Sequence, residues 1–409
     1  MRVLFVTSQF PADPARSVTG SFKRMRMWLD AIRSTGAALE MLFFTPSNAD
    51  ASPESAARLS RALADQWGIS GEVVLCPLES TGDVSGLFGR IWPAFALSKH
   101  PPFEPYRGKR QAEAMAEAVS RSPDVVLFFK LHGATTRWTC RGQAKVLLDL
   151  DDIEHLKFVR EVSQPPRWLA KPLRYLWAPS LWWGERSAIV RSDRAFVCSV
   201  GDRDYLRRAM GVNNVSVIPN AAARVEDHPP SAEPNVLFVG TFGYPPNRVA
   251  AEYLVSEVWP RLSRLRPEAR LLIAGPRPEA VPSFRTPPSG VTFTGFVPDL
   301  DALYARTRVF CCPIQSGGGT RVKVLEAASH GIPVVSTPIG AEGIDLVPDR
   351  EIVLRRGAEE LAAACAELLA DPERAQRLGA LGRDRVRALY SRDAVVGRMA
   401  AMLTGDAPS

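Results

Sequence analysis

The sequence has little cysteine and histidine and no long apolar run. Its six cysteines show no C-x-x-C spacing, and Cys311 and Cys312 lie inside an apolar, strand-like stretch. This pattern predicts buried, reduced thiols and argues against a zinc or disulfide framework. No apolar stretch approaches the ~18 residues that cross a bilayer, and the apolar start of the chain is too short for a signal peptide. The sequence therefore predicts a cytoplasmic protein without a bound metal.

The length and composition favour two folded domains. The chain has 409 residues, more than one hydrophobic core usually serves. Hydrophobic residues make up 46% and charged residues 23%, as in ordinary soluble globular proteins. Disordered, collagenous and coiled-coil classes are excluded as descriptions of the whole chain.

Positive charge is concentrated in the first half. Residues 1–220 hold 29 Lys and Arg against 22 Asp and Glu, whereas residues 221–409 hold 22 of each. Within the basic half, arginines and lysines alternate with Trp168, Trp177, Trp182 and Trp183. This composition is typical of a segment that contacts an anionic membrane surface. The alternative is a helix that packs its aromatic side chains inside the domain, which Pro172 and Pro179 favour. No nucleic-acid-binding motif is present.

Short apolar runs alternate with helical patterns along the chain. Examples are the strand-like Arg2–Thr7, Val125–Phe129 and Val309–Ile314 and the helical Phe22–Arg33 and Thr320–His330. Near-continuous apolar strands between helices predict parallel sheets covered on both faces. The fold class is therefore α/β, with two doubly wound, Rossmann-like domains that face each other across a cleft.

A segment rich in proline, alanine and charge separates the two halves. It runs from Asn220 to Asn235 without a strand pattern and is interpreted as a linker. We expect an N-terminal domain over residues 1–220 and a C-terminal domain over residues 221–389. A C-terminal helix over residues 390–409 is expected to cross back to the first domain.

The most informative motif is a triple glycine between a strand and a helix. Gly317, Gly318 and Gly319 leave backbone N–H groups uncovered at a helix N-terminus, where phosphate binds readily. Arg321 and Lys323 follow in the first turn, where cations oppose the helix dipole unless an anion lies nearby. The motif therefore predicts binding of a diphosphate.

Glu326 lies further along the same helix. A diphosphate at the helix start would place a ribose near this carboxylate, roughly 9 Å along the axis. The alternative is an exposed Lys323–Glu326 ion pair. Two glycine turns support a ligand site. One contains Gly240 and precedes Asn247, which is expected to cap a helix or bind the ligand. The other precedes Val297, whose backbone is expected to contact the base of a nucleotide.

Polar side chains also follow strands in the first half. Gly20 opens a helix after the first strand, His132 follows a second strand, and Asp151 and Asp152 follow a third. Carboxylates and histidines at strand ends are typical of catalytic sites in α/β sheets. The alternatives are helix caps for the aspartates and a surface role for the histidine.

The second half resembles the nucleotide-sugar domain of family-4 glycosyltransferases of the group 1 type, which have the GT-B architecture. The resemblance rests on VGTFGYPPN, LLIAGPRP and VTFTGFVPDL, and above all on GGGTRVKVLEAASHGIPVVSTPIGAEGI. It implies a retaining, metal-independent transferase that moves a sugar from a nucleoside-diphosphate sugar to a glycan or lipid-linked hydroxyl. The implied setting is bacterial polysaccharide or glycolipid synthesis in the cytoplasm, with peripheral contact at the inner membrane face.

The resemblance also implies individual roles. Glu326 would bind ribose, Arg321 and Lys323 the diphosphate, and Val297 the base. Gly20 would close over the donor phosphate from the front domain, and Asp151, Asp152, His132 and Lys323 are the catalytic candidates. The remaining donor-binding candidates are Gly240, Asn247, Gly317, Gly318, Gly319 and Thr320. No cofactor other than the donor is expected.

The sequence departs from the family at one position that bears on activity. Many members carry an acidic residue where Gly318 stands, so the family's usual contact to the donor sugar is absent. Alternatives are a non-catalytic nucleotide-sugar binder and a nucleotide-sugar epimerase of the same fold. A dinucleotide-dependent oxidoreductase is disfavoured because no G-x-G-x-x-G follows the first strand.

Overall fold

The computed structural model describes residues 1–17, 19–79, 103, 106–136, 144–163, 171–222 and 231–405. The chain forms two compact units, Met1–Pro219 with Val395–Ser409, and Asn220–Ala394. Trp168 and residues 223–230 of the predicted linker lie outside the described residues. None of the helices in the described part is long and apolar enough to cross a membrane.

The first unit contains a seven-stranded parallel sheet with the order β3-β2-β1-β4-β5-β6-β7. Phe5 in β1 lies opposite Met41 in β2 and Leu127 in β4. The chain reverses its direction of travel across the sheet between β1 and β4, which makes their carboxyl ends a topological switch point. The strands are β1 (Arg2–Thr7), β2 (Ala38–Thr45), β3 (Glu72–Pro77), β4 (Val125–Phe129), β5 (Lys145–Asp151), β6 (Arg194–Val197) and β7 (Val215–Val217).

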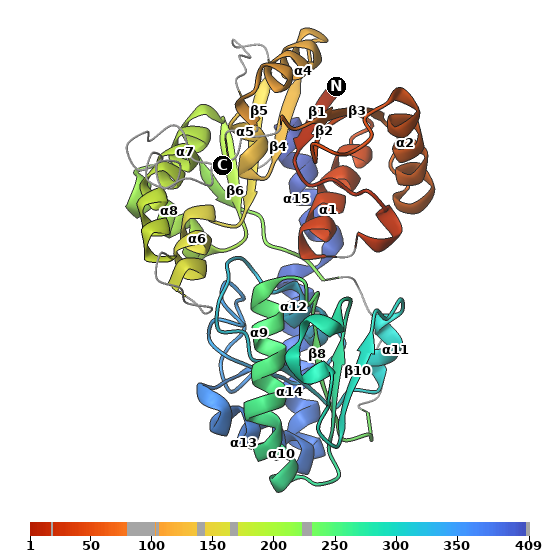
Figure 1. Ribbon diagram of the computed structural model, residues 1–409, viewed down its shortest axis with the longest axis vertical. Helices are drawn as coiled ribbons and strands as arrows, with labels where there is room; N and C mark the ends of the chain where they lie inside the picture. The colour runs from red at the N-terminus through yellow and green to blue at the C-terminus, as the bar shows by residue number, and fades with distance from the viewer. Residues whose placement is uncertain are drawn as a thin grey trace. The chain divides into compact units, whose positions relative to one another are not determined.

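Helices flank this sheet (Figure 1). They are α1 (Gly20–Ser34), α2 (Pro53–Trp67), α4 (Lys109–Ser120), α5 (Leu131–Ala134), α6 (Glu154–Ser163), α7 (Ala178–Arg191) and α8 (Val200–Met210), with 3-10 turns η1 (Pro14–Arg16) and η3 (Lys171–Trp177). The last helix, α15 (Arg392–Thr404), joins the first unit from Val395 onward. The Met402 carbonyl there accepts a hydrogen bond from Lys145 Nζ at 2.6 Å.

The second unit contains a six-stranded parallel sheet with the order β10-β9-β8-β11-β12-β13. The strands are β8 (Asn235–Val239), β9 (Arg270–Ala274), β10 (Val291–Gly295), β11 (Val309–Cys312), β12 (Val334–Ser336) and β13 (Val353–Leu354). The helices are α9 (Pro245–Tyr253), a π-helical turn η4 (Leu254–Val258), α10 (Trp259–Leu265), α11 (Leu300–Ala305), α12 (Val322–Ser329), α13 (Gly357–Ala370) and α14 (Pro372–Tyr390), with 3-10 turns η5 (Pro278–Ala280) and η6 (Pro282–Phe284). The switch point of this sheet lies between β8 and β11.

The central strands are buried on both faces, as near-continuous apolar sequence requires in a covered parallel sheet, whereas the edge strand β10 has exposed positions. Every residue of β4 and β11 is buried. Each unit has its own apolar core, built on β4, β5 and their helices in one and on β8, β11 and theirs in the other. The predicted α/β class with two doubly wound units is confirmed.

Two glycines let the ends of β8 and β9 approach closely. A Cβ atom on Gly275 would lie 1.8 Å from the carbonyl oxygen of Gly240, and Gly275 has a φ of +139°. The Gly240 N–H donates to the Ala274 carbonyl at 2.9 Å. Glycine is therefore required at position 275 for both space and backbone conformation.

A buried ion pair joins α1 to β5. Arg24 donates to Asp149 through Nε at 2.7 Å and Nη2 at 2.9 Å, and both side chains are fully buried. Trp28 Nε1 also donates to Asp149. Arg24 Nη1 donates to the Ile218 carbonyl at 2.9 Å, so the pair also holds the chain after β7.

We expect Arg24→Met to lower the free energy of unfolding of the first unit by about 3–5 kcal/mol, because Asp149 would keep a buried charge without its cation. Chemical denaturation followed by intrinsic tryptophan fluorescence would measure the loss, because eight of the nine tryptophans lie in the first half of the chain. Arg58→Met, which removes an exposed pair with Asp50 at 3.4 Å, is the control and should change nothing measurable. Similar small effects in both variants would contradict this expectation.

Candidate functional site

The glycine turn lies after β11 and before α12. Gly317 has a φ of +108° and Gly319 one of +69°, conformations that favour glycine. A Cβ atom on Gly317 would lie 3.4 Å from Tyr244 Oη, Pro246 Cγ and Arg321 Nη2. The side chain of Arg321, the residue before α12, makes no capping bond in the described structure, and the first turn holds no acidic residue. The N–H groups at this helix start are thus suited to an anion.

Arg321 is folded back over the turn. The residue is 8% exposed, and its Nη1 donates to the carbonyl oxygens of Gly318 and Gly319. Its Nη2 is buried and has no hydrogen-bond partner among the described residues, and the same holds for Thr320 Oγ1. A buried polar group without a partner costs about 1–3 kcal/mol. An anionic ligand at the turn would supply the missing acceptor.

Lys323 reaches toward the turn after β8. Its Nζ donates to Asn247 Oδ1 at 2.7 Å and lies 4.5 Å from the centre of the Phe238 ring. Burial, with the adjacent Arg321, lowers the pKa of Lys323 to about 8. Because Asn247 is a neutral acceptor, it orients the ammonium without cancelling its charge.

Asn247 is not a helix cap, which corrects one of the two roles expected from the sequence. The residue before α9 is Tyr244, and Asn247 is the third residue of the helix. Its Nδ2 donates to the Thr241 carbonyl at 3.1 Å, so both ends of the amide are engaged. A Cβ atom on Gly240 would lie 3.0 Å from Asn247 Cγ, so the glycine makes room for this amide.

The other donor-site candidates lie on the same edge of the second sheet. Gly240 follows β8, Val297 follows β10, and Glu326 lies in α12, half-buried. Val297 packs partly against the core, whereas its neighbour Phe296 is 47% exposed. The structure brings Gly240, Asn247 and Lys323 into one cluster beside β8 and β11.

In the first unit, charged side chains meet at the carboxyl ends of β4 and β5. Lys130 has a φ of +74° and Asp151 one of +60°, and their side chains form an ion pair. Ser21, next to Gly20 at the start of α1, donates to Asp151 Oδ2 at 3.2 Å. Burial opposes ionisation of Asp151, but Lys130 and Arg24 hold its pKa well below the usual range. Two strained residues that bind each other indicate a site under functional constraint.

Asp152 and His132 differ from Asp151 in their ionisation. Burial and the neighbouring Asp151 raise the pKa of Asp152, which makes it the better proton acceptor near neutral pH. Burial lowers the pKa of His132, whose ring centre lies 5.7 Å from that of Phe103 and 5.5 Å from that of Tyr106. Asp151 is thus held by its ion pair with Lys130, whereas the Asp152 carboxylate lies 3.8 Å from the more exposed Lys157.

Sequence reasoning missed Glu185, whose carboxylate lies behind these strand ends. Glu185 Oε1 accepts the Glu154 N–H at 2.9 Å, and Oε2 is hydrogen-bonded to His155 Nδ1. Glu185 lies in the middle of a tryptophan-rich helix, 30 residues from His155. No local motif could have linked the two.

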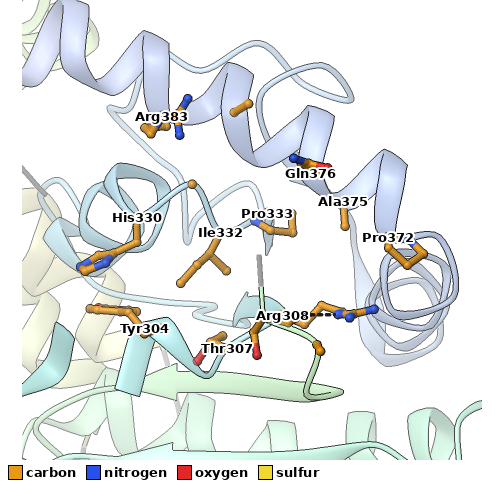
Figure 2. A pocket seen from close by; sticks show the side chains of 15 residues that line it. Tyr304, Thr307, Arg308, His330, Ile332, Pro333, Pro372, Ala375, Gln376 and Arg383 are labelled. Carbon is orange, nitrogen blue, oxygen red and sulfur yellow. Dashed lines mark hydrogen bonds between the residues drawn. The ribbon is translucent and has the colours of Figure 1, made fainter. Parts of the chain in front are cut away.

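A separate pocket of about 380 Å³ lies in the second unit, at the amino ends of β8, β11 and β12 (Figure 2). Arg308, His330 and Arg383 are among its lining residues, and the Tyr304 and His330 rings lie 4.5 Å apart. Arg308 Nε donates to the Ser231 carbonyl at 2.8 Å, and His330 Nε2 lies 3.2 Å from Asp301. Open α/β sheets bind ligands at the carboxyl ends of their strands. The glycine turn, and not this pocket, is therefore the candidate ligand site.

Comparison with known proteins shows which family part of the chain resembles. Residues 233–371 match the family described as Glycosyl transferases group 1. A curated relative from Mycobacterium tuberculosis, named GDP-mannose-dependent alpha-(1-6)-phosphatidylinositol monomannoside mannosyltransferase, is 35% identical over 126 residues. That match covers 28% of this chain and 33% of the relative, so the likeness spans about a third of the relative's length.

Solved structures of similar fold cover the whole chain. Sucrose-phosphate synthase from Thermosynechococcus elongatus has a TM-score of 0.69 at 20% identity and covers 100% of both chains. Anabaena HepE, solved with UDP and glucose, has a TM-score of 0.65 at 13% identity and covers 99% of both chains. These likenesses confirm the predicted GT-B fold. The predicted likeness of the second half to group 1 glycosyltransferases is confirmed by the family match, while the family-4 subtype stays a prediction.

The Lys323 pKa gives a direct test of this site. We expect an NMR titration of the lysine side chains to show one midpoint near 8, absent in Lys323→Arg, far below the usual 10.4. Asn247→Asp should raise that midpoint, since a carboxylate beside the ammonium favours the charged form. Asn247→Ala is the uncharged control and should give no rise. A wild-type midpoint near 10.4 would contradict the burial of this ammonium.

Proposed function

We propose that the protein is a retaining glycosyltransferase that moves a sugar from a nucleoside-diphosphate sugar to a hydroxyl of a glycan or lipid-linked acceptor. The observation that carries the proposal is the glycine turn at α12, where buried Arg321 Nη2 has no hydrogen-bond partner among the described residues and Lys323 is held in place. The family match over residues 233–371 supports it. Retention and the role in bacterial polysaccharide or glycolipid synthesis rest on the sequence resemblance.

In this proposal the second unit stabilises the leaving diphosphate. When the bond between the anomeric carbon and the diphosphate oxygen breaks, negative charge grows on that oxygen. Arg321, Lys323 and the N–H groups at the start of α12 meet this charge, and preorganised groups of this kind usually supply the largest catalytic effect. Glu326 would accept hydrogen bonds from the ribose hydroxyls, and the backbone at Val297 would meet the base.

The first unit would bind the acceptor. Asp152, whose pKa is raised, would take the acceptor hydroxyl proton as the new bond to the anomeric carbon forms. Neutral His132 would hydrogen-bond the acceptor or donor sugar, and Asp151 with Lys130 would hold the strand ends in place.

A nucleotide-sugar binder without turnover is the second candidate. Gly318 stands where many family members carry an acidic residue, which favours this reading. Such a protein would bind the donor at the same site as the proposed transferase but would not transfer the sugar. Release of free nucleoside diphosphate in the presence of acceptors separates the two.

We expect one nucleoside diphosphate among UDP, GDP and ADP to bind in calorimetry and thermal-shift measurements, and Glu326→Ala to weaken it by about tenfold or more, as loss of hydrogen bonds to a charged group implies. GDP-mannose and UDP-glucose are the first donors to test, since the mycobacterial relative is named for GDP-mannose and HepE was solved with UDP-glucose. Glu342→Ala, outside the donor cluster, is the control. Binding of NAD alone would overturn the proposal.

A membrane-facing surface fits a lipid-linked acceptor. Leu173, Tyr175 and Leu176 in η3 and Trp183 in α7 are exposed, the last at 48%. Trp182, by contrast, packs partly against the core. We propose that this surface contacts an anionic membrane at the inner face, because exposed Trp, Tyr and Leu on a basic half suit the lipid interface.

Flotation with vesicles of anionic and neutral phospholipid tests the surface. We expect binding to the anionic vesicles at low salt and a roughly tenfold loss in the Trp183→Ser, Tyr175→Ser double variant, since about 1.4 kcal/mol of apolar burial corresponds to that factor. Leu265→Ser, an exposed leucine of the second unit, is the matched control. Absence of flotation at low salt would end the membrane proposal and leave the donor site untouched.

A further inference from the structure

A chain of buried hydrogen bonds links three helices behind the strand ends of the first unit. Glu185 on α7 is 0% exposed, and its partners are a backbone N–H and an imidazole, not a lysine or arginine of the described chain. His155 on α6 is 5% exposed, and its Nε2 is 2.8 Å from the hydroxyl of Tyr205 on α8. Burial raises the pKa of Glu185, which means that an ionised carboxylate at this position destabilises the fold.

Glu185 acts as a cap for a helix to which it does not belong. The first N–H groups of a helix have no partner inside the helix, and Ser, Thr, Asp or Asn before the helix usually accepts from one of them. The residue before α6 is Ile153, which has no side-chain acceptor. Glu185 accepts the N–H of Glu154, the first residue of α6, and His155 holds its second oxygen. The start of α6 is therefore fastened to α7 at two adjacent points.

The fastened point adjoins the acidic turn after β5. Asp152 lies between the strained Asp151 and the start of α6, and its carboxylate is 3.8 Å from Lys157 Nζ, which is 3.3 Å from Glu154. A shift of the α6 start would move Asp152, Glu154 and Lys157 together. The position of the Asp152 carboxylate thus depends on Glu185 and His155.

We propose that Glu185 and His155 are positioning residues that hold the Asp152 turn in its working geometry, and that Tyr205 fastens His155 in turn. The inference rests on the proposed function, because it assigns Asp152 the acceptor proton. Stability alone does not explain the arrangement: apolar residues often replace a buried ionisable pair without loss of stability, and a serine at position 153 would cap α6 locally. What neither substitute provides is a rigid link from the acidic turn to α7 and α8.

The first test uses the donor identified by nucleotide binding and measures kcat and KM for release of nucleoside diphosphate. We expect Glu185→Gln to lower kcat by up to about 10²-fold, the effect of a displacement near 1 Å. KM for the donor and the Kd of the nucleoside diphosphate should stay within twofold, because the donor cluster belongs to the other unit. Glu161→Gln, an exposed α6 residue paired with Arg174 at 3.2 Å, is the matched control and should leave kcat unchanged.

Double variants separate positioning from simple stabilisation. If Glu185 acts through Asp152, adding Glu185→Gln to Asp152→Asn should lower kcat little further, whereas independent effects would multiply. Tyr205→Phe should cause a smaller loss than Glu185→Gln. A lower melting temperature with unchanged kcat, or multiplied effects, would overturn the proposal.

An activity-independent measurement keeps the proposal testable if no donor turns over. An NMR titration of the aspartate carboxyl groups should show the Asp152 midpoint shifting in Glu185→Gln and in His155→Gln, but not in Glu161→Gln. An unchanged Asp152 midpoint would refute the positioning role whatever the activity. Absence of turnover with a shifted midpoint would instead count against the transferase proposal alone.

Discussion

Parallel pairing of the strands is the constraint on which both candidate sites depend. Because all strands in a sheet run the same way, their carboxyl ends share one edge, and every loop that leaves a strand begins there. The order of each sheet then selects the centre of that edge, between β1 and β4 in the first unit and between β8 and β11 in the second. For this reason, candidate functional residues that lie far apart in the sequence come together at these two places.

The buried cations of the two units have different kinds of partner. In the first, Arg24 and Lys130 are matched by Asp149 and Asp151, so the cations are neutralised and serve to hold strands and helices together. In the second, Lys323 is held by a neutral amide, and Arg321 is held by carbonyl oxygens. Cations whose hydrogen-bond partners are neutral groups keep their charge available for an anionic ligand.

The sequence was sufficient for features that follow from local pattern. Apolar runs such as β4 and β11 predicted buried parallel strands, and three consecutive glycines before Arg321 predicted the phosphate-type turn. The partner of Lys323 was different: helix spacing offered Glu326 only as an alternative to a bound anion, and the hydrogen bond that forms is with Asn247, 76 residues away. Residue spacing along a helix indicates which side-chain contacts are possible, but the tertiary fold determines which of them form.

Long-range contacts were beyond sequence reasoning. Asp151 and Asp152 were indistinguishable as neighbours after a strand, yet one is committed to Lys130 and the other is not. The difference arises from a left-handed turn at Asp151 and from a lysine 21 residues earlier. The role of Glu185 could not be predicted for the same reason, because nothing in the sequence around this glutamate indicates that it caps a different helix.

The contact between Gly240 and Gly275 restricts how this chain can vary. An alanine at position 275 would need the end of β8 to withdraw at the same time as the end of β9, and no single change elsewhere makes that room. Gly240 in turn gives space to Asn247, which orients Lys323. A substitution at Gly275, which has no side chain of its own, would therefore displace the Lys323 ammonium. Substitutions at these turns can be accommodated only when several residues change together.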